Sequence, residues 1–222
     1  MTTTLITGAN RGIGLALAKA AADAGHTVLA TARNPESAAD LASTGARVLA
    51  LDVSDPASCD ALAAELNGEP IDVLVNNAAT FPNRTGLEDV DPDAFEETLR
   101  VNVRGPIVVT KALLPNLRAG HRKVIATISS SMGSIANTEQ GGSYAYRISK
   151  ASVNMMARAL AKEFADMTVL AIDPGWVRTD MGGSDASLSP EESASGMLRV
   201  IEGTTTAQSG AFLRHDGETL PW

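Results

Sequence analysis

The chain alternates short apolar runs with longer segments in which apolar residues recur at the spacing of a helix. The short runs are typical of buried β-strands and cover Thr4–Thr7, Thr27–Ala32, Arg47–Asp52, Ile71–Asn76, Lys123–Ser129, Met167–Asp173 and Ala211–Arg214. Strands that are apolar on both faces and alternate with helices indicate a parallel sheet covered on each side. The pattern therefore predicts an α/β fold, a Rossmann-type doubly wound parallel sheet of about seven strands flanked by helices.

The sequence offers no point at which to divide this fold. It contains no linker rich in proline, glycine or serine and no block of charge, so residues 1–222 are expected to form a single domain. The least regular segment is Met181–Ser195, which is rich in glycine, serine and aspartate. It is expected to be either a mobile surface loop or a lid over a substrate.

Composition narrows the classes of function. Eighteen basic against 26 acidic residues give a formal charge of −8, which disfavours a nucleic-acid partner. The single cysteine, Cys59, excludes an intramolecular disulfide, and the three histidines form no paired motif, which argues against a metal site. No signal-peptide pattern and no run as long as a membrane span is present. A cytoplasmic protein without a membrane partner is expected.

The first candidate for chemistry lies where the first predicted strand passes into the first helix. The segment reads TGANRGIG and places Gly8, Gly12 and Gly14 in one turn. Glycine lets a backbone approach a pyrophosphate closely, and the free N–H groups of a helix start attract the anion. The spacing differs from the usual GxGxxG, and a purely structural turn would also use glycines. The position directly after the first strand favours dinucleotide binding.

The end of the second predicted strand bears on the choice of dinucleotide. A cofactor without a 2′-phosphate is usually held there by an acidic residue that accepts from the ribose hydroxyls. Here Arg33 occupies that region, and Arg11 adds a second cation inside the glycine turn. Both could be solvated surface charges, but guanidinium groups also bind phosphate through charge-assisted hydrogen bonds. We assign Glu36 to a helix start after Pro35, so NADP(H) is favoured over NAD(H).

A second candidate is the pair Tyr146 and Lys150, four residues apart at a predicted helix start. Positions i and i+4 share a helix face, so both side chains can point at one site. A phenol has a pKa near 10, and a neighbouring ammonium would favour its ionised form and make it a useful acid or base. An exposed pair without function is the alternative. Tyr144 has no lysine four residues on and is expected to line a pocket.

Two further polar positions are candidates. The predicted strand Lys123–Ser129 runs into three serines, and a hydroxyl there could bind a substrate carbonyl or simply satisfy the backbone of a turn. Asn102 lies inside an otherwise helical pattern, where asparagine competes for backbone hydrogen bonds. It is expected either to kink that helix and hold a water molecule or to be tolerated on a polar face.

Together these features resemble the classical short-chain dehydrogenases/reductases across nearly the whole chain. The sequence is most similar to their short carbonyl-reductase branch called sniffer-like, which includes the C-factor-like proteins. The strings that carry the resemblance are LITGANRGIGLALA, ATARNP, NNA, SYAYRISKAS, DPGWVRTDMGG and GAFLRHDGETLPW. Two departures occur: Ala79 replaces a glycine, and Ser130 and Tyr146 are 16 residues apart, so the loop Asn137–Gly142 should bulge outward.

The resemblance implies a catalytic tetrad of Asn102, Ser130, Tyr146 and Lys150. Tyr146 would exchange a proton with the substrate, Ser130 would polarise the substrate oxygen, Lys150 would bind the nicotinamide ribose and lower the phenol pKa, and Asn102 would order a water molecule. The residues expected at the cofactor are Gly8, Asn10, Arg11, Gly12, Ile13, Gly14, Arg33, Asp52, Val53, Asn76, Ala78, Tyr146, Lys150, Pro174, Gly175, Val177 and Thr179.

The substrate itself is less well indicated. Apolar residues near predicted strand ends suit an apolar carbonyl compound, although simple packing is the alternative reading of Phe81, Met132, Ile135, Tyr144 and Trp176. Two functions are considered: an NADP(H)-dependent reductase of aldehydes, ketones or quinones, and a non-enzymatic sensor or signalling protein of the same fold. Apolar residues on more than one side of Asp93–Leu117 and Ala151–Phe164 predict a homodimer, with a tetramer as the alternative.

Overall fold

A computed structural model describes residues 1–82 and 84–222 of the chain. Within them, seven strands form one parallel sheet in the order β3-β2-β1-β4-β5-β6-β7. The strands are β1 (Thr3–Ile6), β2 (Thr27–Ala32), β3 (Arg47–Ala50), β4 (Val73–Asn76), β5 (Val124–Ile128), β6 (Thr168–Asp173) and β7 (Ala211–Arg214). The predicted sheet is confirmed, and no strand end differs from its expected place by more than two residues.

The strand order reverses direction at the centre of the sheet. From β1 the chain winds outward through β2 to β3, then returns to β4 and winds outward the other way. The loops that follow β1 and β4 therefore diverge, one to each face. In doubly wound sheets the crevice between such loops, at the carboxyl ends of the strands, is where ligands bind.

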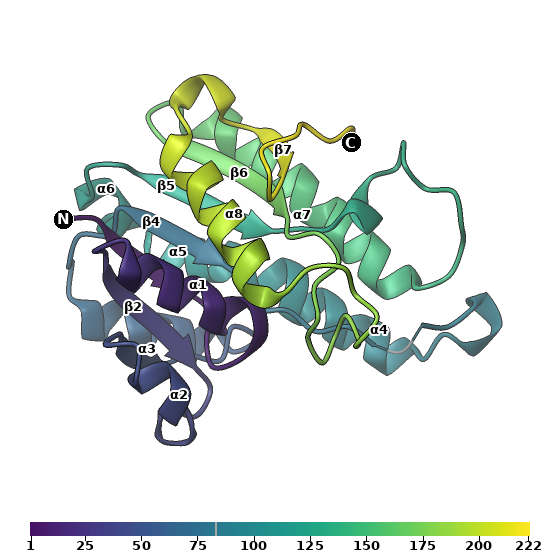
Figure 1. The fold of residues 1–222 in the computed structure, drawn as a ribbon, viewed down its shortest axis with the longest axis horizontal. Coiled ribbons are helices and arrows are strands. Elements are labelled where there is room, and N and C mark those ends of the chain that lie inside the picture. The colour runs from purple at the N-terminus through teal and green to yellow at the C-terminus, as the bar shows by residue number, and fades with distance from the viewer. Residues whose placement is uncertain (83) are drawn as a thin grey trace.

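Helices cover both faces of the sheet (Figure 1). They are α1 (Gly12–Asp23), α2 (Ala39–Ala42), α3 (Pro56–Leu66), α4 (Pro92–Leu99), α5 (Gly105–Ala112), α6 (Leu114–Ala119), α7 (Tyr144–Glu163) and α8 (Pro190–Gly203). Of the helices in the described residues, none has both the length and the apolar character needed to cross a membrane.

Two hydrophobic cores lie on opposite sides of the sheet because alternate strand residues point to opposite faces. On β4, Val73 and Val75 pack toward α1 and α8, whereas Leu74 packs toward α3, α5 and α7. The helices α1 and α8 lie side by side on the first face (Figure 1). Both faces of the central strands are therefore dry, as their unbroken apolar runs predicted.

The segment Met181–Ser195 is only partly a loop. Its last six residues belong to α8, which begins at Pro190. The side chain of Ser189 accepts from the backbone N–H of Glu192, and the Glu192 side chain accepts from the backbone N–H of Ser189. This capping box fixes the start of the helix. The expectation of one loop or lid through Ser195 is wrong for its final six residues.

A π-helical turn interrupts the path from α4 to α5. It covers Arg100–Arg104 and contains Asn102, which is buried. π-turns inside helices widen the coil locally and often occur at functional sites. The structure thus agrees with a helix distorted at Asn102, and the alternative of an asparagine tolerated on a polar surface is wrong.

Candidate active site

The turn between β1 and α1 can be built only with glycine. Gly8 and Gly12 have φ angles of +62° and +55°, which side chains rarely adopt. A Cβ on Gly14 would lie 2.5 Å from the Asn77 side-chain nitrogen and 2.5 Å from the Gly8 carbonyl oxygen. The backbone is consequently bare, and its N–H groups at the start of α1 are open to an anion. These residues fit the pyrophosphate of a dinucleotide.

Two side chains that sequence analysis did not single out hold this turn in place. Asn77 donates from Nδ2 to the carbonyl oxygens of Thr7 at 2.9 Å and Gly8 at 3.0 Å. The Thr7 hydroxyl accepts from the backbone N–H groups of Asn77 and Ala78, each at 3.0 Å. The ends of β1 and β4 are thereby locked together, and Ala78 lies directly against Gly8. In the sequence, the string Asn76-Asn77-Ala78 was the signal from which the contacts of Asn77 could have been inferred.

Other residues expected at the cofactor lie around the same strand ends but differ in exposure. Asn10 is exposed and Ile13 is half-buried at the start of α1. Asn76 is buried inside the sheet, where its Nδ2 donates to the Thr110 hydroxyl at 3.2 Å and its Oδ1 has no partner. Asn76 therefore supports the site from behind, while Ala78 is the residue of this string that reaches the crevice side.

The adenosine end of the expected site gathers an acid and a cation. Asp52 follows β3 and accepts from the backbone and hydroxyl of Ser54, and the hydroxyl bond is the largest cause of its lowered pKa. The positive charge of Arg33, exposed after β2, lowers that pKa further. Val53 is buried beside them. Arg33 is thus close enough to this edge of the crevice to act on its charges.

Arg11 has a partner within the chain, and its expected role as a phosphate ligand stays a prediction. Its guanidinium donates to the Asp180 carboxylate at 2.7 Å, and both side chains are exposed. A Cβ on Gly12 would lie 3.3 Å from the Thr179 methyl group. The glycine turn therefore touches the loop that follows β6 at two adjacent points, and Arg11 is paired with an acid of this chain.

The loop after β6 carries the last group of expected cofactor residues. Pro174 is buried, Gly175 has a φ of +78°, and Val177 forms a β-bridge with Leu188. This bridge folds the loop back so that Thr179 reaches the glycine turn. A Cβ on Gly175 would lie 2.6 Å from the Leu188 side chain, so glycine is required there.

Tyr146 and Lys150 project from the first turns of α7 toward the end of β5. They are 8% and 3% exposed, and the Lys150 ammonium lies 5.4 Å from the centre of the Tyr146 ring. Lys150 Nζ donates to the Ile128 carbonyl oxygen at 2.8 Å. Such burial excludes the alternative of an exposed, idle pair. Ser130 lies two residues after the end of β5, and its hydroxyl accepts from the backbone N–H of Met132 at 3.2 Å.

Burial shifts the pKa values of both Tyr146 and Lys150. It raises the pKa of Tyr146 to about 12, and a hydrogen bond with Ser130 opposes that shift. It lowers the pKa of Lys150 to about 8, against the negative charge of Asp173. At neutral pH the phenol therefore carries its proton, and an added positive charge nearby would make that proton easier to release.

Asp173 is a buried acid that sequence analysis did not single out. It lies at the end of β6 and accepts from the backbone N–H of Ser131 at 3.0 Å. Burial raises the pKa of its carboxyl, and hydrogen bonds from Ser131 and Gly175 oppose that effect. Asp173 thus connects the serine turn to the loop after β6 and places a negative group beside the buried lysine.

Asn102 is fixed by three hydrogen bonds. Its Oδ1 accepts from the backbone N–H of Thr80 at 2.8 Å, and its Nδ2 donates to the Thr80 carbonyl at 2.8 Å and the Ser149 hydroxyl at 3.1 Å. The loop after β4 is thereby tied to α7 just beneath Tyr146. The role of Asn102 in ordering a water molecule stays a prediction.

The expected substrate residues divide into two groups. Phe81 and Tyr144 line one pocket of about 430 Å³ together with Thr85, Val90 and Phe95, and the Phe81 ring meets Tyr146 edge-to-face at 4.7 Å. Met132 and Trp176 lie outside this lining. Trp176 is half exposed, and its indole nitrogen donates to the Gly182 carbonyl at 2.8 Å. Only two of these expected substrate residues, Phe81 and Tyr144, therefore line the same pocket.

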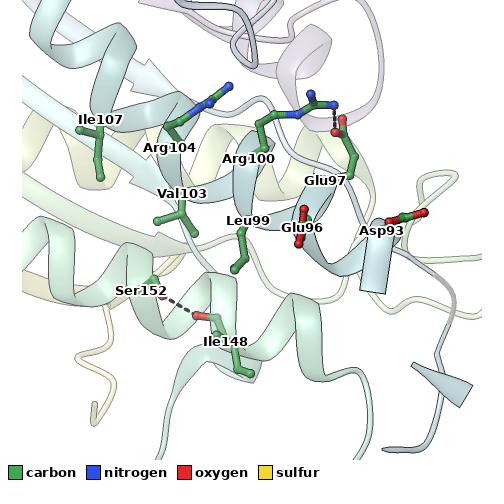
Figure 2. A pocket seen from close by; sticks show the side chains of 10 residues that line it. All are labelled: Asp93, Glu96, Glu97, Leu99, Arg100, Val103, Arg104, Ile107, Ile148 and Ser152. Atoms are coloured by element: carbon green, nitrogen blue, oxygen red, sulfur yellow. Dashed lines mark hydrogen bonds and ion pairs between the residues drawn. The ribbon is translucent and has the colours of Figure 1, made fainter. Parts of the chain in front are cut away.

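A second hollow lies on the outer surface of α4, the π-turn and α7, and has a volume of about 690 Å³. Figure 2 shows Leu99, Val103 and Ile148 facing one another across it, with charged residues along its edge. Ile107 and Ile148 are exposed there, and Met155 is exposed farther along α7. This surface matches the helix faces from which a dimer was predicted.

The sequence is similar to a known protein family and to individual known proteins. A model of the short chain dehydrogenase family matches residues 2–188. The protein named C-signal, from Myxococcus xanthus, is 45% identical over 156 residues, which cover 69% of this chain and 93% of that protein.

Solved structures match over the whole chain. The carbonyl reductase Sniffer of D. melanogaster has a TM-score of 0.94 and 33% identity, with 100% of both chains covered. An NADPH-bound carbonyl reductase from chicken fatty liver has a TM-score of 0.93 and 31% identity, covering 100% of this chain and 99% of its own.

Proposed function

Because the chain belongs to the short-chain dehydrogenase family, we propose that it is an NADP(H)-dependent carbonyl reductase acting on aldehydes, ketones or quinones. One observation carries the proposal: Tyr146 and Lys150 are buried together beside Ser130, at the carboxyl edge of the sheet, the edge from which the glycine turn also leaves β1. A domain that only bound a nucleotide would have no need to bury a phenol and an ammonium at this point.

The residues around the crevice fit NADP(H). The bare glycine turn would hold the pyrophosphate, Arg33 the 2′-phosphate, and the Pro174–Thr179 loop and Lys150 the nicotinamide riboside. Solved relatives described as bound to NADPH or NADP support the choice of cofactor. When bound, the cofactor supplies the hydride for reduction of a carbonyl carbon.

The side chains of this chain supply the proton and the polarisation. In the reducing direction the Tyr146 hydroxyl donates its proton to the carbonyl oxygen, and its raised pKa keeps that proton in place until the substrate is bound. Ser130 donates a hydrogen bond to the same oxygen. The Lys150 ammonium stabilises the phenolate left behind, and Asn102 orders a water molecule that returns a proton.

The test is NADPH consumption by the purified protein against a panel of aldehydes, ketones and ortho-quinones, with NADH in parallel. Turnover with NADPH that exceeds turnover with NADH is the expected result. Faster turnover with NADH would contradict the cofactor assignment. Tight NADPH binding without turnover of any compound would contradict the proposed reductase activity.

That last outcome would favour the second candidate, a protein of the same fold that senses or signals rather than catalyses. The observation behind it is the 45% identical relative whose name is C-signal. The retention of Ser130 beside the buried Tyr146 and Lys150 favours the reductase, because a sensor could lose them without cost to binding.

We further propose that the chain works as a homodimer through the hollow on α4 and α7. Exposed Ile107, Ile148 and Met155 support this, since clustered apolar side chains on a helix face are typical of an interface. Sedimentation of the wild type and of Ile148→Glu tests it. A dimer that becomes a monomer in the variant is expected, and a monomeric wild type would contradict it. The cytoplasmic location stays a prediction.

A further inference from the structure

The turn that carries Ser130 is short and contributes little stability of its own. It consists of a single 3-10 turn, Ser131–Gly133, and Ser130 itself is extended, with φ −166° and ψ 148°. One helical turn cannot hold a side chain against thermal motion without outside support. Yet Ser130 must meet Tyr146, which belongs to another element, with the accuracy that a proton transfer requires. Some group must fix the distance between this turn and α7.

Asn154 reaches both sides of the turn. It lies on α7, four residues after Lys150 and eight after Tyr146, and therefore on the same helix face. Its Oδ1 accepts from the Ser129 hydroxyl at 2.6 Å, just before Ser130. Its Nδ2 donates to the Gly133 carbonyl at 3.2 Å, at the end of the turn. One amide thus bridges the residues that flank Ser130.

The surroundings leave this amide little freedom. Asn154 and Ser129 are 3% and 1% exposed. A Cβ on Gly133 would lie 2.7 Å from the backbone carbon of Lys150, so the turn already rests on the helix without a gap. The Ser129 hydroxyl also has a longer contact, 3.4 Å, with the Lys150 carbonyl oxygen. An apolar residue at position 154 would leave the Gly133 carbonyl without this donor and the Ser129 hydroxyl with that longer contact alone, in a buried environment. The turn would lose its tie to α7 at Gly133 and could shift.

We propose that Asn154 is a positioning residue that sets the distance of Ser130 from Tyr146. The inference rests on the proposed reductase function. Asn154 does not touch the reacting atoms, and it acts by clamping the two ends of the serine turn onto the helix that carries the tyrosine and the lysine. Ser129 is its partner, so the loss of either side chain should misplace Ser130 in the same way.

The experiment compares Asn154→Ala and Ser129→Ala with Asn116→Ala. Asn116 is also buried, and its Nδ2 donates to the Glu69 carbonyl at 2.9 Å, at the opposite edge of the sheet. It therefore reports what a lost buried amide costs in stability alone. Each variant is measured for Tm, kcat, the Kd of NADPH, amide hydrogen exchange of the segment 129–134, and the pH dependence of alcohol oxidation.

For Asn154→Ala we expect kcat to fall about 30-fold, because a misplacement of about 1 Å costs up to about 100-fold. Ser129→Ala, the milder change, should lose about 5-fold. The Kd of NADPH should stay within about 2-fold in both. Exchange in the segment 129–134 should rise. The acidic limb of the alcohol oxidation profile, along which the rate rises as Tyr146 loses its proton, should move to higher pH, since the hydrogen bond from Ser130 lowers the pKa of Tyr146.

The outcomes separate this inference from the proposed function. Wild-type protein that consumes no NADPH with any carbonyl compound contradicts the function. An active wild type whose Asn154→Ala and Ser129→Ala variants keep kcat and the pH profile contradicts the inference alone. So does a loss of kcat in Asn116→Ala as large as in Asn154→Ala at equal Tm, because it would show that lost stability, rather than position, is responsible. If Asn154→Ala does not fold, Ser129→Ala decides.

Discussion

The floor and the rim of the candidate site are built in opposite ways. The floor comprises the buried residues Ser129, Tyr146, Lys150 and Asn154 and the half-buried Ser130, and hydrogen bonds tie its parts together. The rim consists of the loops 84–90, 135–142 and 176–189, of which the first two project from the same end of the sheet (Figure 1). There Ile135 is 79% exposed and Trp176 is 50% exposed.

This difference in packing predicts which part of the site sets the reaction rate and which part sets the substrate preference. A packed floor has one arrangement, so a change there alters the reacting geometry and kcat. An exposed rim has few contacts to lose, so a change there alters which substrate is held, and how tightly, at little cost in stability. For the proposed reductase, we therefore expect the floor to carry out the reaction and the rim to select among carbonyl compounds.

Removal of the Tyr146 hydroxyl should give the largest effect. Tyr146→Phe keeps the ring that packs on Phe81 but loses the proton, so kcat should fall about 1000-fold with an unchanged Kd for NADPH. Steady-state kinetics and a binding titration measure both. Tyr144→Phe, two residues away on the rim, is the matched control and should lose less than about 3-fold. Equal losses in the two variants would erase the distinction between floor and rim.

The glycine turn should be nearly as intolerant. In Gly14→Ala the new Cβ meets two polar atoms at 2.5 Å, so the turn must shift and NADPH affinity should fall about 50-fold. Gly203→Ala, at the end of α8 with open space around it, should leave affinity unchanged. Calorimetric titration distinguishes them, and tight binding by Gly14→Ala would show that the turn is not the pyrophosphate site.

The burial of Lys150 should be visible in stability without cofactor. Between its folded pKa of about 8 and its ordinary value of 10.5, the unfolded chain binds more protons than the folded one, so stability rises with pH. We expect the unfolding free energy to gain about 2 kcal/mol between about pH 7.5 and pH 9.5. Urea unfolding of Lys150→Met should lack this gain, whereas Lys162→Met, exposed on the same helix, should keep it. Parallel pH dependence in Lys150→Met and wild type would contradict the assignment.

Arg33 tests the adenosine end of the site, which lies outside both the floor and the rim. In Arg33→Ala the KM for NADPH should rise about 10-fold and that for NADH stay within about 2-fold, because only the former carries the 2′-phosphate. Arg47→Ala is the control, since Arg47 begins β3 at the other end of the sheet and pairs with Glu65 and Glu69. A matching rise for NADH would remove Arg33 from the phosphate site.

The smallest effect is expected on the rim itself. Trp176→Ala removes an exposed indole, so KM for bulky carbonyl compounds should change about 3-fold while kcat and Tm stay close to wild type. A panel of substrates of increasing size provides the measurement. If kcat dropped by more than about 10-fold, Trp176 would belong to the floor.

The local parts of this picture could be predicted from the sequence. The strands were found because both faces of a parallel sheet are apolar, and the turn at Gly8–Gly14 and the Tyr146–Lys150 pair are compact motifs. The start of α8 also has a sequence signal that the sequence analysis does not use, the capping box of Ser189 and Glu192 with Pro190 at the first helical position.

The residues that sequence analysis did not single out act across long separations. Asn77 supports a turn 70 residues earlier, and Asn154 clamps a turn 25 residues earlier. Asp173 accepts from a residue 42 positions away. An isolated polar residue in an apolar pattern shows that a partner is needed but not which one. The ion pair between Arg11 and Asp180, which are 169 residues apart, could not be predicted from the sequence pattern for the same reason.

We propose that the site reduces a carbonyl group with a hydride from NADPH and a proton from Tyr146. The most direct test is a reaction of the wild type with NADPH that carries deuterium at C4 of the nicotinamide, followed by mass spectrometry of the alcohol formed from an aldehyde or ketone. We expect one deuterium on the carbinol carbon of the wild-type product, and about 1000-fold less labelled alcohol from Tyr146→Phe over the same time. An alcohol without deuterium from either C4 position, or equal labelling by the variant, would contradict it.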